Sequence, residues 1–416
     1  MDPVPVVGAG LAGSEAAWQI AEAGFPVRLY EMRPTVPTPA HRSDACAELV
    51  CSNSLGSCLP DRAGGVLQAE LRALGSRLLA IAEATAVPAG QALAVDRERF
   101  AAEVTRALSE HPRIEIVRRE VRAVPEAPVA VVASGPLTSD ALAADLARLA
   151  GRGHLAFFDA VAPVVETATL DRSVVFAASR WNRGSAAEGD YLNVPLERED
   201  YEALVDGLLR AERIPLREFE TADPRARRFF ERCLPVEVLA ARGRDALRFG
   251  PLRPVGLIDP RTGRRPWAVI QLRAENRQGT LHNLVGFQTN LRYGEQERLL
   301  RRLPGLARAE FVRFGSMHRN TFLRSPELLR PTLEWRTRPG LFVAGQLTGM
   351  EGYLGNIGSG LLAARNAVRR LAGGEPEVLP VDTLLGALAR HVAEAPAADF
   401  QPMKAEFGLL PPLPGR

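Results

Sequence analysis

Two cysteines stand in settings that favour a reactive thiolate. Cys51 lies in the stretch ELVCSNSL, where serine and asparagine neighbours can donate hydrogen bonds to a thiolate. Cys233 lies in FFERCLPVE, where Arg232 would favour the thiolate and Glu237 could accept a proton. A single cysteine is more often an inert, buried small residue, so each interpretation depends on what surrounds the thiol.

The remaining cysteines, Cys46 and Cys58, raise the question of a metal site shared with Cys51. Their spacings do not give C-x-x-C, and no histidine cluster accompanies them. We therefore expect no metal. We interpret Cys51, Cys233 and Glu237 as candidate catalytic residues instead.

A glycine-rich segment at the start of the chain has the spacing of a dinucleotide-binding loop. Val4–Val7 is an apolar run typical of a buried parallel strand, and Gly8, Gly10 and Gly13 follow it as G-x-G-x-x-G. The first glycine allows a tight turn, and the second lets a pyrophosphate approach the backbone. The third lets the following helix pack on the strand.

The residues after this loop complete a strand, helix and strand unit. We expect a helix over 14–23, ended by Gly24, with its N-terminal N–H groups directed at the phosphates. A second strand over 27–30 would end at Glu31. An acid at this distance from the glycines accepts hydrogen bonds from the adenosine ribose.

A second glycine-rich segment lies near the other end of the chain. Leu341–Ala344 reads as a strand, and Gly345 follows at its carboxyl end, where open α/β sheets bind ligands. A helix is predicted over 359–367, and its N-terminus would stabilise the negative charge of a reduced flavin. Two distant glycine segments on one sheet indicate FAD rather than NAD alone. The residues expected to contact FAD are Gly8, Ala9, Gly10, Leu11, Ala12, Gly13, Glu31, Arg33, Ser134, Gly135, Gly345, Gln346, Glu351, Gly352 and Gly358.

Composition narrows the class of protein. The 416 residues suggest two or three domains, and 46% hydrophobic with 24% charged residues is ordinary for a globular protein. No run approaches the roughly 20 apolar residues of a membrane span, and no signal peptide precedes the first strand. We expect a cytoplasmic protein without a membrane partner. Of the 52 basic residues only Lys404 is lysine, and arginine suits phosphate and base contacts.

The pattern along the chain predicts an α/β fold, a Rossmann-like FAD-binding domain of the glutathione-reductase type with an inserted α+β domain. Strand and helix patterns alternate at the start, and another apolar strand over 129–133 leads into a small-residue turn. Prolines, aromatics and arginines then mix with short strand-like runs. We expect the FAD-binding domain over 1–150 and 329–416, and the insertion over 151–328.

Several stretches together resemble the folate- and FAD-dependent tRNA (uracil-54-C5)-methyltransferases, a family related to the GidA/MnmG flavoproteins. They are spread over nearly the whole chain. GAGLAGSEAA is generic to flavoproteins, whereas ELVCSNSL, CLPVE, GFQT and the C-terminal FQPMKAEFG are specific. A sister family that modifies wobble uridines has a longer C-terminal helical extension that this chain lacks.

The resemblance implies an activity and roles for particular residues. It implies 5,10-methylenetetrahydrofolate as one-carbon donor, reduced FAD as hydride source and NAD(P)H to reduce the flavin. Cys233 matches the cysteine assigned to attack C6 of uracil, and Cys51 matches the one placed near the flavin. His318 is the candidate imidazole on the far face of the folate's pterin ring.

A tRNA substrate requires positive surface. Arg225 and Arg228 precede the Cys233 motif and are the candidate tRNA contacts, with further arginines up to Arg253. Two alternatives remain open from the residues alone. One is an FAD-dependent oxidoreductase acting on a small molecule, and the other is a non-catalytic flavin-containing RNA-binding protein.

Overall fold

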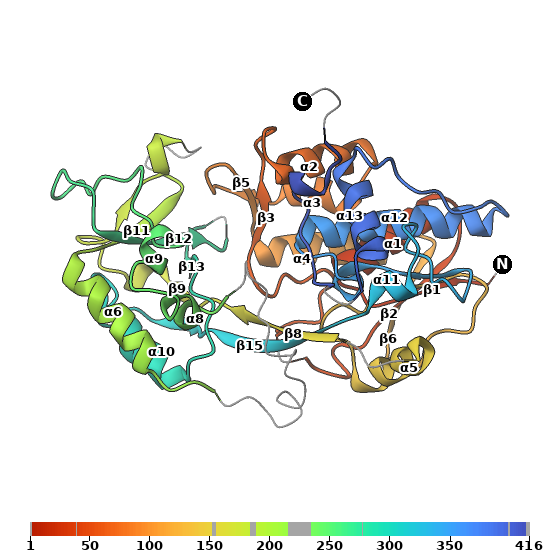
Figure 1. Ribbon diagram of the computed structural model, residues 1–416, viewed down its shortest axis with the longest axis horizontal. Helices are drawn as coiled ribbons and strands as arrows, with labels where there is room; N and C mark the ends of the chain where they lie inside the picture. Colours follow the sequence, from red (N-terminus) through yellow and green to blue (C-terminus); the bar gives the residue numbers. More distant parts are fainter. Residues whose placement is uncertain are drawn as a thin grey trace.

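The computed structural model describes residues 2–38, 40–151, 155–183, 189–214, 234–276, 278–397 and 400–412, without the side chains of 155–161, 182 and 316–321. Figure 1 shows a region built on a parallel sheet beside a region built on an antiparallel sheet. Two long antiparallel strands, β8 (Leu155–Val161) and β15 (Ser316–Phe322), run between the two regions.

The parallel sheet brings the two glycine-rich segments together. Its strand order is β16-β7-β1-β2-β6, and every pairing is parallel. Strand β1 therefore lies at the centre, with β7 on one side and β2 on the other, and all of β1, β7 and β16 is buried. The strands are β1 (Val4–Val7), β2 (Val27–Glu31), β6 (Ile114–Arg118), β7 (Ala130–Val132) and β16 (Leu341–Val343).

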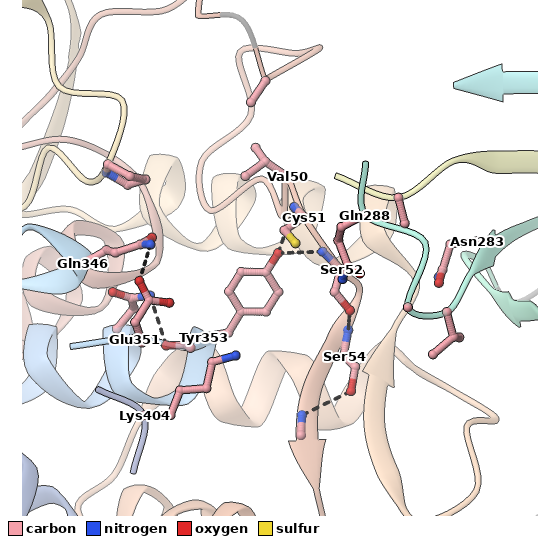
Figure 2. Close-up of a pocket in the computed structure, with 18 of the residues that line it drawn as sticks. Val50, Cys51, Ser52, Ser54, Asn283, Gln288, Gln346, Glu351, Tyr353 and Lys404 are labelled. Atoms are coloured by element: carbon pink, nitrogen blue, oxygen red, sulfur yellow. Dashed lines mark hydrogen bonds between the residues drawn. The ribbon is translucent and has the colours of Figure 1, made fainter. Parts of the chain in front are cut away.

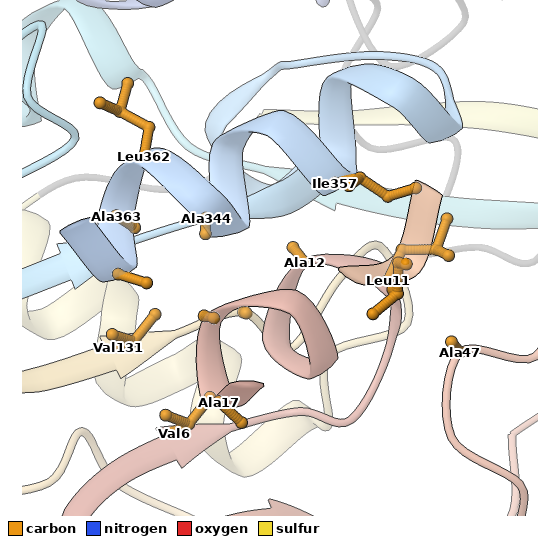
Figure 3. Packing of buried hydrophobic residues seen from close by; sticks show 14 of the residues in the cluster. Val6, Leu11, Ala12, Ala17, Ala47, Val131, Ala344, Ile357, Leu362 and Ala363 are labelled. Carbon is orange, nitrogen blue, oxygen red and sulfur yellow. The ribbon is translucent and has the colours of Figure 1, made fainter. Parts of the chain in front are cut away.

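Two helices pack directly on each other beside this sheet, α1 (Leu11–Glu22) and α12 (Tyr353–Leu371). A Cβ at Gly360 would lie 2.1 Å from the carbonyl oxygen of Ala12, so only glycine permits this approach. Figure 3 shows Ala12 on the side of α1 that faces α12, whereas Ala17 lies on the opposite side of the helix, next to Val6 of β1. The predicted starts of both helices are wrong, because α1 begins three residues before Ser14 and α12 begins six residues before Ser359.

The rest of the parallel-sheet region supports the segment that carries Cys51. Strand β3 begins three residues after Cys51 and pairs with β5 in a small antiparallel sheet of order β3-β5-β4. These strands are β3 (Ser54–Ser57), β4 (Ala86–Val87) and β5 (Ala92–Val95). The further helices are α2 (Ala63–Ala73), α3 (Arg77–Ala84), α4 (Arg97–Glu110), α5 (Asp140–Ala150), α11 (Ser325–Leu328) and α13 (Leu384–Glu394).

The antiparallel-sheet region has its own hydrophobic core. Its strand order is β10-β11-β12-β13-β9-β14, and its strands are β9 (Val164–Glu166), β10 (Phe176–Ala177), β11 (Tyr191–Leu196), β12 (Ala268–Ala274), β13 (Leu281–Leu284) and β14 (Phe311–Arg313). Helices of this region are α6 (Arg198–Arg210), α8 (Val236–Ala240), α9 (Ala246–Phe249) and α10 (Tyr293–Leu300). The predicted fold class, a parallel-sheet α/β domain with an inserted α+β domain, is confirmed, whereas the exact domain limits stay a prediction.

Candidate functional site

The loop between β1 and α1 has the geometry that the glycine spacing predicts. Gly8 has a φ of 98°, in the left-handed region. A Cβ at Gly13 would lie 1.7 Å from the carbonyl oxygen of Gly8, so the helix can approach the strand only with glycine there. Within the described part of the chain, no atom lies within 4 Å of the position that a Cβ at Gly10 would take. The backbone is therefore open to a ligand at Gly10, as a pyrophosphate requires.

Glu31, at the end of β2, lies directly beneath this loop. Its carboxylate accepts hydrogen bonds from the backbone N–H of Ala9 at 3.1 Å and from Nε of Arg33 at 2.9 Å. Burial alone would raise the pKa of Glu31, but the hydrogen bonds and the charge of Arg33 outweigh burial and lower it. Glu31 is therefore ionised at neutral pH and can accept hydrogen bonds from ribose hydroxyls.

A cavity of about 120 Å³, here the nucleotide cavity, opens above the loop. Residues from both glycine-rich segments line it, although they are more than 300 positions apart in the chain. Ten of the predicted FAD-contacting residues are among its lining: Gly8, Gly10, Leu11, Ala12, Glu31, Arg33, Ser134, Gly135, Gly345 and Gln346.

Gly358 does not fit the predicted contact with FAD. It lies within α12, and a Cβ there would meet the side chains of Leu385 at 2.8 Å and Leu71 at 3.2 Å. It lines neither of the two cavities described here. Gly358 therefore packs on the protein core, and the N-terminus of α12 that faces the site is at Tyr353 instead.

A larger cavity of about 340 Å³, here the catalytic cavity, adjoins the nucleotide cavity. Cys51, Glu351 and Gly352 line it, as do residues of the antiparallel-sheet region. Figure 2 shows Tyr353 in the middle of this site, with its hydroxyl directed at the Cys51 segment. The two cavities share Val50, Pro136, Leu137, Gln346, Tyr353 and Asn356, so a ligand can extend from one into the other.

The backbone around Cys51 is held by Tyr353. The hydroxyl oxygen of Tyr353 accepts hydrogen bonds from the backbone N–H of Cys51 at 3.1 Å and of Ser52 at 3.0 Å. Burial raises the pKa of Tyr353, so the phenol stays protonated and can donate a hydrogen bond of its own. These contacts fix the backbone of Cys51 in the wall of the catalytic cavity, next to Val50, which lines both cavities.

Positive charge gathers around Cys51. Arg273 of β12 donates to Oγ of Ser52 at 2.7 Å and to Oδ1 of Asn53 at 2.9 Å. Arg97 forms a two-fold ion pair with Glu275, at 2.7 and 2.9 Å. Three guanidinium groups, those of Arg97, Arg273 and Arg313, interact electrostatically with the Cys51 thiol. Their positive charge favours a thiolate.

The candidate site contains residues that the sequence did not single out: Tyr353, Arg273, Asn356 and Lys404 all line the catalytic cavity. A signal existed for Lys404, because it is the one lysine in a chain with 51 arginines. Its aliphatic chain lies against Gly352, within 3.7 Å of where a Cβ would be. Asn356 carries a buried Oδ1 with no hydrogen-bond partner among the described residues, which suits a ligand that donates a hydrogen bond.

Glu237 is fully buried in α8 and is tied to its surroundings. One carboxylate oxygen accepts from Oγ1 of Thr289 at 2.7 Å, and the other accepts from the backbone N–H of Asn290 at 2.9 Å. The interpretation of Glu237 as a proton acceptor is not supported by this geometry. It anchors the helix that follows Cys233 instead.

The other predicted residues divide into three groups. Cys46 is buried in the core, where burial raises the pKa of its thiol, and Cys58 is exposed. His318 lies on β15, paired with Asp159 of β8, but its side chain is outside the described part. Cys233, Arg225 and Arg228 lie outside the described residues altogether.

Known proteins resemble the chain over its whole length. A family profile described as Glucose inhibited division protein A matches residues 3–375. A protein of Synechococcus sp. is 55% identical over 414 residues, covering 100% of this chain and 89% of its own length. A protein of Pelotomaculum thermopropionicum is 55% identical over 413 residues, covering 99% of this chain and 93% of its own. Both are named methylenetetrahydrofolate–tRNA-(uracil-5-)-methyltransferase TrmFO.

The chain belongs to the TrmFO family. The resemblance inferred from the sequence motifs is thereby confirmed. Two crystal forms of Aquifex aeolicus GidA have the same fold as this TrmFO-family chain, each with a TM-score of 0.70. The matches cover 94% of this chain and 67% and 69% of the GidA chains. Because the sequences are only 18% and 19% identical, the likeness concerns the fold alone.

In the described part of this TrmFO-family chain, no helix is both long enough and apolar enough to cross a membrane. Nor do three or more histidine, cysteine, aspartate or glutamate side chains gather there in a way that could hold a metal ion.

Proposed function

We propose that this chain methylates C5 of uridine 54 in the T-loop of tRNA, with 5,10-methylenetetrahydrofolate as the one-carbon donor. The observation that carries the proposal is the position of the Cys51 thiol, in a cavity that adjoins a dinucleotide-binding loop. The whole-length identity to proteins named as this kind of methyltransferase supports the same reaction and substrate.

FAD fits the nucleotide cavity on structural grounds. The open backbone at Gly10 suits the pyrophosphate, and ionised Glu31 suits the adenosine ribose. The unpartnered Oδ1 of Asn356 suits a donor from the ligand at the point where the two cavities meet. When bound, reduced FAD supplies the hydride that turns the one-carbon unit into a methyl group, and NAD(P)H is the proposed reductant.

The chain's own residues prepare the thiol chemistry. Uracil C5 is a poor nucleophile, and addition of a thiolate at C6 makes it nucleophilic. The family resemblance assigns this addition to Cys233 and a flavin-side role to Cys51. Tyr353 and Arg273 hold the Cys51 segment by hydrogen bonds, and the nearby guanidinium charges favour its thiolate. Lys404 adds a further cation to the lining of the same cavity.

The proposal also implies where the protein is located and how the chain is divided into domains. A tRNA-modifying enzyme acts where tRNA is found, so we place the protein in the cytoplasm. The FAD-binding domain would comprise 1–150 and 329–416, with the insertion over 151–328 forming the tRNA side of the catalytic cavity. Limited proteolysis followed by mass spectrometry of the fragments tests this division.

The proposed reaction is tested by incubating unmodified tRNA with the protein, methylenetetrahydrofolate and NAD(P)H. Mass spectrometry of T-loop nucleosides should find 5-methyluridine, and deuterium carried by the nicotinamide should appear in its methyl group. The matched control adds S-adenosylmethionine in place of the folate. A methyl group that comes only from S-adenosylmethionine, or no methylated uridine at all, would overturn the proposal.

A further inference from the structure

Trp181 is an exposed aromatic residue held in a strained conformation. Its side chain is 66% exposed, and its backbone has a φ of 58° and a ψ of 25°. A non-glycine residue in this left-handed region, and an indole left in water, each cost free energy. The backbone N–H of Trp181 donates to the carbonyl of Gly256 at 2.8 Å, and the indole packs against the same glycine. The surroundings therefore fix the ring while leaving most of it open to solvent.

The indole stands beside exposed apolar and basic side chains. Val255 and Ile258, on either side of the Gly256 contact, are 43% and 57% exposed. The segment 241–265 contains seven arginines and two aspartates. An exposed aromatic ring beside many cationic side chains is typical of surfaces that bind single-stranded nucleic acid.

Two arginines next to Trp181 carry charge that no described carboxylate balances. Arg180 donates to Oε1 of Gln271 at 3.1 Å and to the carbonyl of Val255 at 2.6 Å. Burial and the nearby charge of Arg253 lower the pKa of Arg180. Neither Arg180 nor Arg253 forms an ion pair with a described residue. Two guanidinium groups that repel each other are stabilised by an anion that binds both.

This surface is continuous with the wall of the catalytic cavity. Gln271, the partner of Arg180, lies on β12 two residues before Arg273, which lines the cavity and contacts the Cys51 segment. Gly286 also lines the cavity, and the place of its missing Cβ lies 2.3 Å from Pro251 in the segment that carries Arg253. A polymer that enters the cavity can therefore lie across Trp181.

We propose that Trp181, Arg180 and Arg253 form an RNA-binding surface at the rim of the catalytic cavity, here the Trp181 surface. The indole stacks on an unpaired base near the target uridine, and the two guanidinium groups bind an adjacent phosphate. This proposal rests on the proposed function, because it takes tRNA as the substrate. Unpaired bases suit the site, since base-paired RNA offers no free face for stacking.

The test uses the FAD-loaded full chain and measures Kd by fluorescence anisotropy over a series of salt concentrations. The probes are a labelled T-arm hairpin RNA and a blunt RNA duplex of equal length. The variants are W181A, W181F, R253A and the control R210A, which removes an exposed arginine on α6. Flavin absorbance and thermal unfolding report whether each variant is folded.

We expect W181A to raise the Kd for the hairpin about tenfold without changing its Kd for the duplex. W181F should keep most of the affinity, because phenylalanine still stacks. R253A should reduce the slope of log Kd against log salt by about 1, whereas R210A should leave it unchanged.

A hairpin Kd and salt slope equal to wild type in both W181A and R253A would overturn the proposed Trp181 surface while leaving the proposed function intact. Equal weakening of both probes by W181A would overturn the stacking role. Failure of wild type to methylate tRNA would overturn the proposed function itself.

Discussion

Replacing Gly10 with valine separates the binding of FAD from the folding of the chain. No atom of the described residues lies within 4 Å of the new Cβ, and the φ of −74° and ψ of −168° suit any residue. The local cost comes from the N-cap position of α1, where valine is poorer than glycine by about 1 kcal/mol. The protein without cofactor should therefore fold with nearly its normal stability.

FAD should bind much more weakly to Gly10→Val. The valine side chain would occupy part of a nucleotide cavity of only about 120 Å³, at the point where the pyrophosphate must approach the backbone. Overpacking of this kind costs about 1–3 kcal/mol, which lowers affinity by roughly fivefold to 150-fold. At a free FAD concentration 100 times the wild-type Kd, wild type gains about 2.7 kcal/mol from the cofactor, and the variant would lose about 1 to 2.4 kcal/mol of this gain.

The assay compares flavin absorbance after gel filtration with thermal unfolding in the presence and absence of added FAD. Gly294→Val is the matched control, because that glycine, on α10, also has open space around its Cβ position. Gly13→Ala should instead be unstable even without FAD, because its Cβ would overlap the carbonyl oxygen of Gly8. If Gly10→Val retains stoichiometric FAD, the loop after β1 is not the pyrophosphate site.

Four further outcomes are expected. Cys51→Ala should lower turnover by several orders of magnitude while retaining FAD. The control variants Cys46→Ala and Cys58→Ala, the second at an exposed position, should turn over normally. Equal loss of turnover in all three variants would refute a special role for Cys51. Wild type incubated with 5-fluorouridine-containing tRNA and then denatured should retain a covalent adduct that Cys233→Ala lacks, and an adduct lost only in Cys51→Ala would reverse the two roles. Tyr353→Phe should lower the free energy of unfolding, measured with denaturant, by about 1–3 kcal/mol, because the backbone N–H groups of Cys51 and Ser52 lose their acceptor. An unchanged denaturant midpoint would contradict these hydrogen bonds. Burial alone would raise the pKa of Glu275, but the charge of Arg97 outweighs burial and lowers that pKa below the ordinary 4.5. The ionised carboxylate should therefore stabilise the fold fully above pH 4.5, and this contribution should be lost as the pH falls through the lower pKa of the folded protein. Glu275→Gln should flatten the acid side of a curve of unfolding free energy against pH.

The parts of the fold that the sequence predicts are those governed by local constraints. The spacing of Gly8, Gly10 and Gly13 restricts the backbone at short range, and the structure has the strand, loop and helix that this spacing predicts. The start of α12 was missed for an equally local reason. Gly355 and Gly358 are poor helix formers, but in the structure they allow the helix to pack against Leu388 and Leu385, and this packing outweighs their low propensity.

The composition of the site depends on contacts that sequence patterns do not reveal. Tyr353 lies about 300 residues from Cys51, and Arg273 lies more than 200 residues away, so no periodicity links them. Glu237 shows the opposite problem. Its position near Cys233 in the sequence suggests acid–base chemistry, whereas the fold uses both of its oxygens to anchor α8.

The Cys51 segment is held from both regions of the molecule. From the parallel-sheet region, Tyr353 accepts hydrogen bonds from two of its backbone N–H groups. From the antiparallel-sheet region, Arg273 binds Ser52, and the Nδ2 of Asn53 donates to the carbonyl of Ala274 at 2.7 Å. A cofactor bound to one region and an RNA bound to the other would therefore both act on the backbone that positions this thiol. If the Cys51 thiol is catalytic, its position in the cavity therefore depends on how the two regions are arranged.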